Sequence, residues 1–153
     1  MSHKLTQEQA ALQLKSALNC AQAVAMQWAE EFGYEREEAG RMAAAFGGGM
    51  GRGEVCGAVS GALLVLGWKY GHGAPDETAK KLQMKRKALE FQQKFMERHG
   101  TEICRELTGF DFSKQGEYER AMQSGRLSTF CPALVADALE ILEEVMSEDE
   151  ACE

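Results

Sequence analysis

The sequence lacks any long apolar run. Its longest apolar stretch, residues 58–68, is interrupted by Ser60, Gly61 and Gly67 and is much shorter than the roughly 20 residues that a membrane-spanning helix needs. The first residues also lack the apolar core of a secretory signal peptide. We therefore expect a cytoplasmic protein with no segment inserted in a membrane.

Runs of alternating apolar and polar residues, which indicate half-buried strands, are also missing. Apolar residues instead recur at spacings of three and four, which is the period of a helix. Because the length of 153 residues is near the usual size of one domain, we predict an all-α fold, a single-domain multi-helix bundle over residues 1–147. The acidic residues 148–153, which include Cys152, are predicted to form a disordered tail.

Positive charge is scarce, since 17 Lys and Arg stand against 24 Asp and Glu and give a net charge of -7. The surface as a whole should repel phosphate backbones, so we expect no binding of nucleic acid. One basic stretch, residues 80–98, is an exception. We interpret it as the solvated face of a helix, with a binding surface as the alternative.

The N-terminal part predicts two helices. Thr6 opens a capping-box pattern, and the apolar face that follows predicts one helix as far as about Phe32. A second helix is expected over residues 36–46, with Met42 and Phe46 facing inward.

Glycine is concentrated where this second helix ends. Five of the seven residues 47–53 are glycine, which is costly in backbone entropy unless the conformation requires it. We predict a glycine-rich connection between two helices, the second of which continues to about Tyr70. Gly57 and Gly61 lie four residues apart on that helix and leave a bare patch where another helix can pack closely.

The C-terminal half predicts three further helices. The first follows Pro75 and ends near His99, and the second is short and carries Cys104. Residues 110–128 show no regular spacing of apolar residues and are predicted to be irregular, with a helical turn around residues 118–122. The last helix is expected to begin at Cys131, directly before Pro132.

The chain has five cysteines but no Cys-x-x-Cys pair. A cytosolic domain of this size does not need a disulfide framework, because its thiols are kept reduced. The cysteines are therefore candidates for chemistry. The alternative for each of them is an ordinary small, buried hydrophobic residue.

Four cysteine-containing segments carry a resemblance. They are NCAQAV at residues 19–24, CGAVSG at residues 56–61, CREL at residues 104–107, and Cys131. Together they resemble the family of redox-active proteins named for its C, GCAxxG, C, C pattern, from about Asn19 to the last helix. Many members of this family of small bacterial and archaeal proteins are encoded near transporter genes. The resemblance implies a redox or metal site and a redox partner, such as a membrane transporter system, but no particular reaction.

Two kinds of chemistry are open to Cys20, Cys56, Cys104 and Cys131. Four thiolates complete the ligand shell of zinc or of an iron–sulfur cluster, although such ligands are usually closer in sequence. Thiol–disulfide exchange needs only two or three cysteines and a stabilised thiolate. The sequence does not decide between iron–sulfur, zinc and a site without a cofactor.

Cys56 and Cys131 are our candidates for redox-active thiols, because both are predicted at helix starts, where backbone amides favour a thiolate. We expect Cys56 to have the lowered pKa and to be the most reactive. Arg52 either stabilises that thiolate or faces solvent.

Other sites have less support. The glycine-rich stretch lacks a Gly-Lys-Ser/Thr ending and therefore predicts close packing rather than a phosphate site. A cysteine hydrolase would need Cys56 to pair with His72 or His99, but His72 lies in a glycine loop and His99 at a helix end. The alternative to a redox protein is a non-enzymatic helical interaction module whose cysteines are merely buried.

Overall fold

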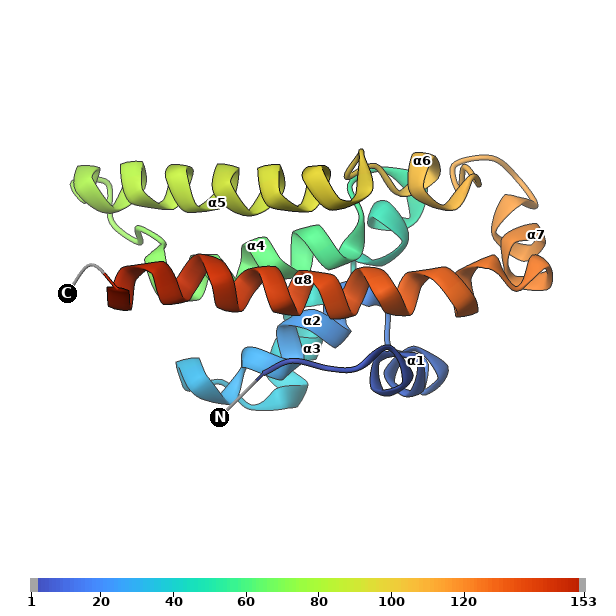
Figure 1. Cartoon of the computed structure of the whole chain (residues 1–153), viewed down its shortest axis with the longest axis horizontal. Coiled ribbons are helices and arrows are strands. Elements are labelled where there is room, and N and C mark those ends of the chain that lie inside the picture. Colours follow the sequence, from blue (N-terminus) through green and yellow to red (C-terminus); the bar gives the residue numbers. More distant parts are fainter. Residues whose placement is uncertain (1–2, 152–153) are drawn as a thin grey trace.

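The computed structural model describes residues 3–151, with side chains as far as residue 147. Within these residues, eight α-helices follow one another (Figure 1): α1 (Gln7–Lys15), α2 (Cys20–Trp28), α3 (Arg36–Ala43), α4 (Gly57–Tyr70), α5 (Thr78–His99), α6 (Cys104–Thr108), α7 (Glu117–Ser124) and α8 (Arg126–Ala151). Two short helical turns, η1 (Glu30–Phe32) and η2 (Gly49–Gly53), complete the secondary structure. Residues 3–151 contain no strand, and the only strand-like pairing joins Val55 to Ile103. The predicted all-α fold is therefore confirmed.

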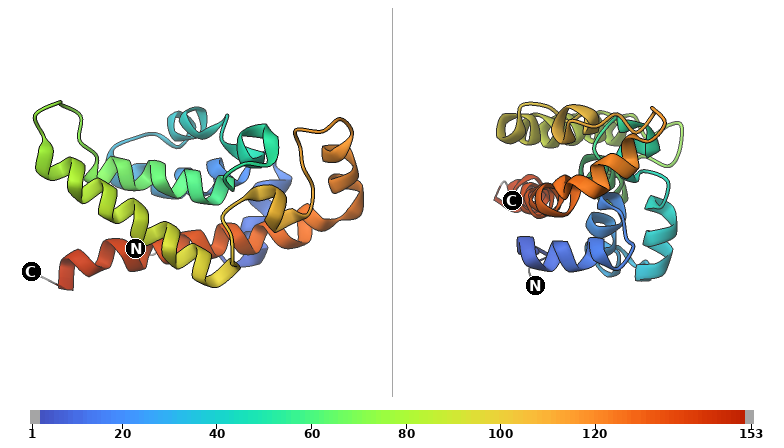
Figure 2. Two further views of the ribbon diagram at one scale, coloured as in Figure 1. Left: turned by 90° about the horizontal axis from the view of Figure 1, so that it is seen from above. Right: turned by 90° about the vertical axis from the view of Figure 1, so that its right-hand side faces the viewer.

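The long helices α5 and α8 run along the molecule, and α4 packs against both of them (Figure 1). Helix α1 packs against the other side of α8, α2 packs against both α4 and α8, and α3 packs on α2, as the end-on view of Figure 2 shows. Fully buried side chains of these helices form one continuous core, which includes Leu66, Phe91 and Leu139. Within residues 3–151, no helix combines the length and the apolarity required to cross a membrane.

The helix predicted from Thr6 to about Phe32 is wrong in one respect, because it is broken between α1 and α2. Ala17 adopts a left-handed conformation with φ of 70°, and Asn19 then caps α2. The Asn19 side chain accepts a hydrogen bond from the Gln22 amide at 2.9 Å, and the Gln22 side chain accepts one from the Asn19 amide at 3.0 Å. This capping box starts a new helix at Cys20.

The predicted helix over residues 36–46 is also too long. Helix α3 ends at Ala43, and only its small residues Ala39, Gly40 and Ala43 are buried. Met42 and Phe46 are 38% and 37% exposed, so the prediction that they face inward is wrong. The glycines after Phe46 favour turns over a further helical turn.

The predicted close approach at Gly57 and Gly61 is confirmed, and α2 is the helix that makes it. A Cβ atom on Gly61 would lie 2.6 Å from the carbonyl oxygen of Ala21, and one on Gly57 would lie 3.2 Å from the Cβ of Cys20. The backbone of α2 therefore lies directly on α4. This contact brings Cys20 next to the start of α4.

Helix α5 ends at His99 as predicted, where Gly100 adopts a left-handed conformation. Several of its basic side chains pair with acidic groups on α8. Arg98 lies 2.9 Å from Glu144 and 3.7 Å from Asp137, and Lys94 lies 3.9 Å from Glu144. Much of the basic stretch is therefore neutralised within the fold.

The C-terminal region is more helical than predicted. Residues 117–124 form α7, and α8 begins at Arg126 rather than at Cys131. Pro132 therefore lies inside α8, where it cannot donate a hydrogen bond to the carbonyl of Ser128. The helix also continues through residues 148–151, which were assigned to a disordered tail, since no glycine or proline interrupts them. Cys152 lies outside the described residues.

Candidate functional site

A cavity of about 620 Å³ has all four of the predicted cysteines in its wall. Cys20 and Cys104 are the first residues of α2 and α6, Cys56 is the residue directly before α4, and Cys131 lies in the N-terminal part of α8. Three separate helix starts and one helix side therefore meet around one cavity, in the right-hand half of Figure 1. The four residues are spread over more than 100 positions of sequence but share one cavity.

Asn19 holds Cys20 in place. The Asn19 side chain caps α2, and its Nδ2 atom also donates a hydrogen bond to the carbonyl of Ala44 at 2.9 Å. Gly47 lies against the same side chain, because a Cβ atom there would lie 2.2 Å from the Cγ of Asn19. The start of α2 is thus tied to the glycine-rich segment.

A short antiparallel pairing holds Cys56 beside Cys104. The amide of Cys56 donates to the carbonyl of Glu102 at 2.7 Å, and the amide of Cys104 donates to the carbonyl of Glu54 at 2.6 Å. These two bonds flank the Val55–Ile103 pair. The backbone alone therefore fixes the separation of these two cysteines.

Gly49 makes this pairing possible. It has φ of 62°, and a Cβ atom on it would lie 2.3 Å from the amide nitrogen of Glu54 and 2.9 Å from the Cβ of Cys104. A side chain at this position would therefore meet backbone atoms that cannot move easily. The prediction that the glycine-rich segment serves close packing rather than phosphate binding agrees with this geometry.

Burial has the largest effect on the pKa of the Cys56 thiol. Desolvation raises the pKa of Cys56 to about 12, although the amides of Ala58 and Val59 at the start of α4 donate to its sulfur and act in the opposite direction. Our expectation of a lowered pKa at Cys56 is therefore wrong: the helix start is present, but the loss of water outweighs it. Desolvation likewise raises the pKa of Cys104 to about 11, and the neighbouring Cys131 raises it further.

Cys131 is the thiol whose pKa is lowered. The Cys20 thiol donates a hydrogen bond to the Cys131 sulfur, which lowers the pKa of Cys131 and raises that of Cys20. The positive charge of Arg126 lowers the pKa of Cys131 further. Sequence reasoning chose Cys131 for a helix start that it does not occupy, so the cause is different from the one we gave.

Arg126 is a charged neighbour of the cavity cysteines that sequence reasoning missed. Its guanidinium lies 3.8 Å from the ring centre of Phe130 and donates to the carbonyl of Leu107 at 3.0 Å, which holds it near Cys131. Arg52, which we had considered for this role, is exposed and lies outside the cavity wall. Finding Arg126 from the sequence would have required the prediction that the last helix begins at residue 126, since such a helix places Arg126 little more than one turn before Cys131.

Comparison with known proteins gives one match. A family model described as "Putative redox-active protein (C_GCAxxG_C_C)" matches residues 18–145, which include all four cavity cysteines. The chain belongs to this family. No curated protein and no solved structure matches it.

The family pattern differs from this chain at one place. The chain has Cys56 followed by Gly57, whereas the pattern places glycine before the cysteine of its GCAxxG segment. Here the glycine after the cysteine also lies against α2, since its Cβ would lie 3.0 Å from the amide nitrogen of Ala21. Gly57 therefore allows Cys20 and Cys56 to lie close together.

The arrangement of the cysteines distinguishes between kinds of metal site. Within the part of the chain that the structure describes, no three His, Cys, Asp or Glu side chains are close enough to hold one metal ion. Tetrahedral zinc needs four sulfurs at about 2.3 Å from a single centre, so the spacing of these side chains, although not their chemistry, differs from that of a zinc site. In a [2Fe–2S] or [4Fe–4S] cluster, four cysteines are shared among two or four iron atoms instead of one. Four cysteine thiols around one cavity are nevertheless the donor set of such a cluster, with Cys20 and Cys131 as one close pair and Cys56 and Cys104 as a second interacting pair.

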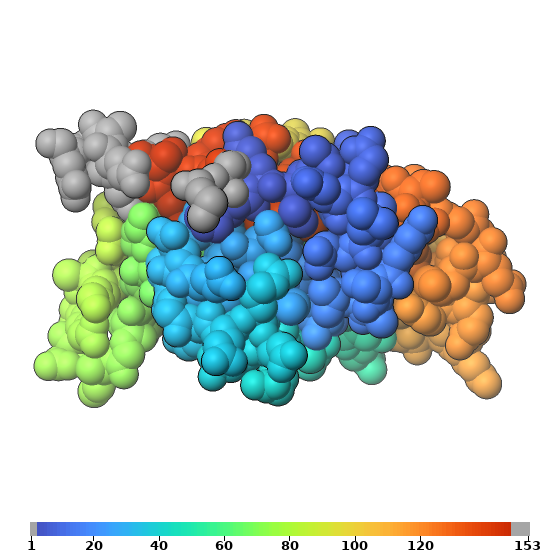
Figure 3. Space-filling view, turned by 90° about the horizontal axis from the view of Figure 1, so that it is seen from below, coloured from blue at the N-terminus to red at the C-terminus, as the bar shows by residue number. Residues whose placement is uncertain are grey.

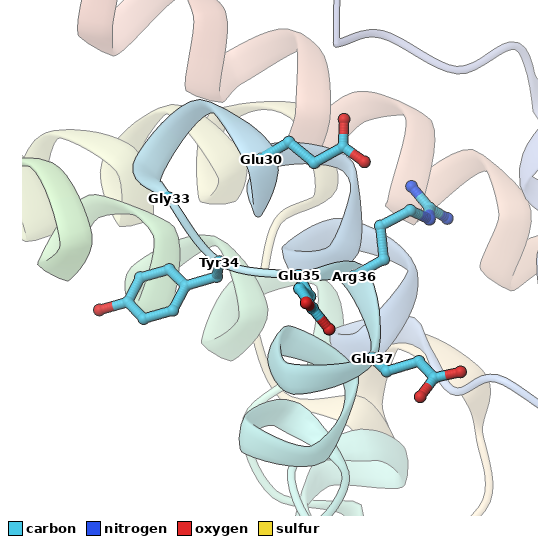
Figure 4. A pocket seen from close by; sticks show the side chains of 6 residues that line it. All are labelled: Glu30, Gly33, Tyr34, Glu35, Arg36 and Glu37. Carbon is cyan, nitrogen blue, oxygen red and sulfur yellow. The ribbon is translucent and has the colours of Figure 1, made fainter.

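Neither of the considered histidines lines the cavity. His99 lies 2.9 Å from Asp137 at the end of α5, and His72 is exposed. The described residues therefore give no histidine partner for a hydrolytic cysteine. A second hollow of about 480 Å³ lies between η1 and α3 (Figure 4), but its wall contains no cysteine, and Tyr34 and Arg36 point to opposite sides of it.

Proposed function

We propose that the protein is an electron carrier in which Cys20, Cys56, Cys104 and Cys131 hold an iron–sulfur cluster. The observation that supports this proposal is that one cavity has all four thiols in its wall. Four cysteine thiolates are the usual ligands of [2Fe–2S] and [4Fe–4S] clusters, and a bound cluster supplies one-electron transfer. The family description agrees with a redox role.

Helix starts and backbone amides at the cavity would offset part of the negative charge of cluster-bound thiolates. Cys20 and Cys56 lie at the starts of α2 and α4, where the helix dipoles are positive. The amides of Ala58 and Val59 donate to the Cys56 sulfur. Hydrogen bonds to ligand sulfurs are among the features that set the potential of a cluster, and burial of Cys56 and Cys104 limits the access of water.

The raised pKa values also support a cationic occupant. Cys56 and Cys104 resist ionisation because burial and neighbouring sulfurs disfavour a further negative charge. Iron in a cluster would supply the missing positive charge and stabilise the thiolates. Without such an occupant, Cys20, Cys56 and Cys104 remain protonated at neutral pH, because the pKa of each of these thiols is raised.

Thiol–disulfide exchange is the second candidate, and one observation favours it. Cys20 donates a hydrogen bond to the Cys131 sulfur, and the pKa of Cys131 is lowered. In this reaction the Cys131 thiolate would attack a disulfide of a redox partner, and Cys20 would then resolve the mixed disulfide. The protein gains one disulfide and the partner gains two thiols. This alternative leaves Cys56 and Cys104 without a role.

Anaerobic purification tests both candidates. The wild type and single serine variants of the four cysteines should be compared by iron and sulfide analysis and by visible absorption, with Cys152→Ser as the matched control. A cluster predicts brown protein, loss of iron in the four variants, and unchanged iron in the control. Metal-free protein with a reversible Cys20–Cys131 disulfide would support exchange instead.

A third outcome would contradict both redox proposals. Metal-free protein in which no cysteine forms a reversible disulfide would leave a helical interaction module. In that case Cys56→Ser should alter stability but no redox property. A module of this kind could associate with a membrane transporter system, as the resemblance implies.

A further inference from the structure

The cavity is larger than the four sulfurs require. Its volume of about 620 Å³ falls within the range of small-molecule pockets, roughly 300 to 1,000 Å³. Most of the wall beyond the cysteines is apolar. It comes from α1 and the turn after it (Ala11, Leu14, Ala17, Leu18), from Phe112 and α7, and from the start of α8 (Leu127, Pro132, Leu134). Figure 3 shows the α1 segment in blue next to the α7 segment in orange.

Most polar side chains in this wall already have partners in the protein. Asn19 caps α2 and donates to Ala44, the Thr108 hydroxyl donates to the carbonyl of Cys104 at 2.8 Å, and the Ser128 hydroxyl donates to that of Gly125 at 3.1 Å. They are therefore poor candidates for contacts with a ligand. Two other polar side chains of the wall remain for contacts with a ligand.

Lys15 and Tyr118 are the exceptions. Among the described residues of the wall, the Lys15 ammonium and the Tyr118 hydroxyl have no hydrogen-bond or ion-pair partner. Tyr118 is 51% exposed and its ring packs edge-on against Phe112, with ring centres 5.4 Å apart. The wall thus offers apolar and aromatic surface together with two donors.

We propose that this cavity binds a quinone, with its ring against the apolar wall and its carbonyl oxygens accepting hydrogen bonds from Lys15 and Tyr118. A single lysine is too little positive charge for a nucleotide phosphate chain, and the apolar wall disfavours a peptide or a sugar. The choice of a quinone over other apolar rings with acceptor oxygens rests on the proposed redox function. The fit of such a ring to the cavity is independent of the proposed function, because it rests on the volume and the apolar wall alone.

Duroquinone is a suitable probe, because its fully methylated ring leaves no free position for addition of a cysteine thiol. Durene, the same methylated ring without carbonyl oxygens, is the matched control ligand. Binding to the anaerobically purified full chain should be measured by equilibrium dialysis, with folding checked by circular dichroism. Iron content and visible absorption should be recorded on the same samples.

We expect saturable binding of one duroquinone per chain and at least tenfold weaker binding of durene. Lys15→Met and Tyr118→Phe should each weaken duroquinone binding about three- to tenfold, as the loss of one hydrogen bond implies. The matched variants Lys81→Met and Tyr34→Phe alter side chains outside the cavity wall and should leave it unchanged. Leu18→Trp should block binding by filling the cavity.

Two results would overturn the inference: no saturable binding of duroquinone by folded protein, or equal binding of both rings with no effect of Lys15→Met and Tyr118→Phe. Iron-containing protein that fails to bind duroquinone would refute the quinone site and leave the electron-carrier proposal intact. Iron-free protein that binds duroquinone with the expected variant effects would support the site and contradict the cluster.

Discussion

Replacement of Gly61 by alanine should separate α2 from α4. A Cβ atom on Gly61 would lie 2.6 Å from the carbonyl oxygen and 2.9 Å from the Cα of Ala21. These atoms belong to the backbone of α2, so they cannot rotate away as the end of a side chain could. The helices must move apart, and Cys20, the residue before Ala21, must move with α2.

The cost can be worked out from the two opposing effects. Overpacking of a well-packed contact costs roughly 3 kcal/mol at the upper end of its usual range. The better helix propensity of alanine offsets roughly 1 kcal/mol of this. The free energy of unfolding should therefore fall by about 2 kcal/mol, which corresponds to a decrease in Tm of about 4–8 °C for a chain of this size.

Gly67→Ala is the matched control on the same helix. A Cβ atom there would have nothing within 4 Å, so only the helix propensity changes and Tm should rise by about 1–4 °C. Thermal unfolding followed by circular dichroism measures both variants. Gly61→Ala with the stability of the wild type would refute the close packing of α2 on α4, and with it our account of how Cys20 reaches the cavity.

Three further predictions concern the thiols and the start of α2. In reduced, metal-free protein, alkylation followed by mass spectrometry should modify Cys131 at lower pH than Cys56 or Cys104, and Arg126→Met should raise the pH at which Cys131 reacts. Alkylation of Cys56 at lower pH than Cys131 would contradict these directions of the pKa shifts. Burial raises the pKa values of Cys56 and Cys104 from 9.0 to about 12 and about 11. The stability that their neutral forms contribute is therefore complete below pH 9 and is lost as the pH rises towards these values. Denaturant unfolding should show this decrease in the free energy of unfolding, and the decrease should be smaller in Cys56→Ala. Asn19→Ala should cost about 1 kcal/mol of stability through loss of the cap and lower the iron content, whereas Asn19→Asp should keep most of the stability; equal stability of all three proteins would contradict the role of the cap.

The features that could be predicted from the sequence depend on local signals. The helical period of the apolar residues predicts the all-α fold, and the spacing of Gly57 and Gly61 predicts a close helix contact. The end of α5 follows from a glycine that adopts a left-handed conformation. Each of these signals lies within a few residues of the structure that it determines.

The break before Cys20 was missed because apolar residues keep a helical spacing on both sides of it. The available signal was the Asn19–Gln22 capping box, which has the same form as the one at Thr6. A helix start inside an apparently continuous pattern can therefore be recognised from its cap, even where the period gives no indication.

The chemistry of the individual thiols could not be predicted, because it depends on neighbours that are distant in sequence. Cys131 owes its lowered pKa to Cys20, which lies 111 positions earlier, and to Arg126. Cys56 has the helix start that the sequence indicates, but burial outweighs it. Burial of a particular sulfur is a property of the packed molecule and leaves no local signal in the sequence.

The most direct test of the cluster proposal is the iron and sulfide content of anaerobically purified protein, measured together with its visible absorption, in the wild type, Cys56→Ser and Cys152→Ser. We predict bound iron and sulfide with visible absorption in the wild type and in Cys152→Ser, and loss of both in Cys56→Ser. Colourless wild-type protein that holds no iron, even after anaerobic reconstitution with iron and sulfide, would contradict the account.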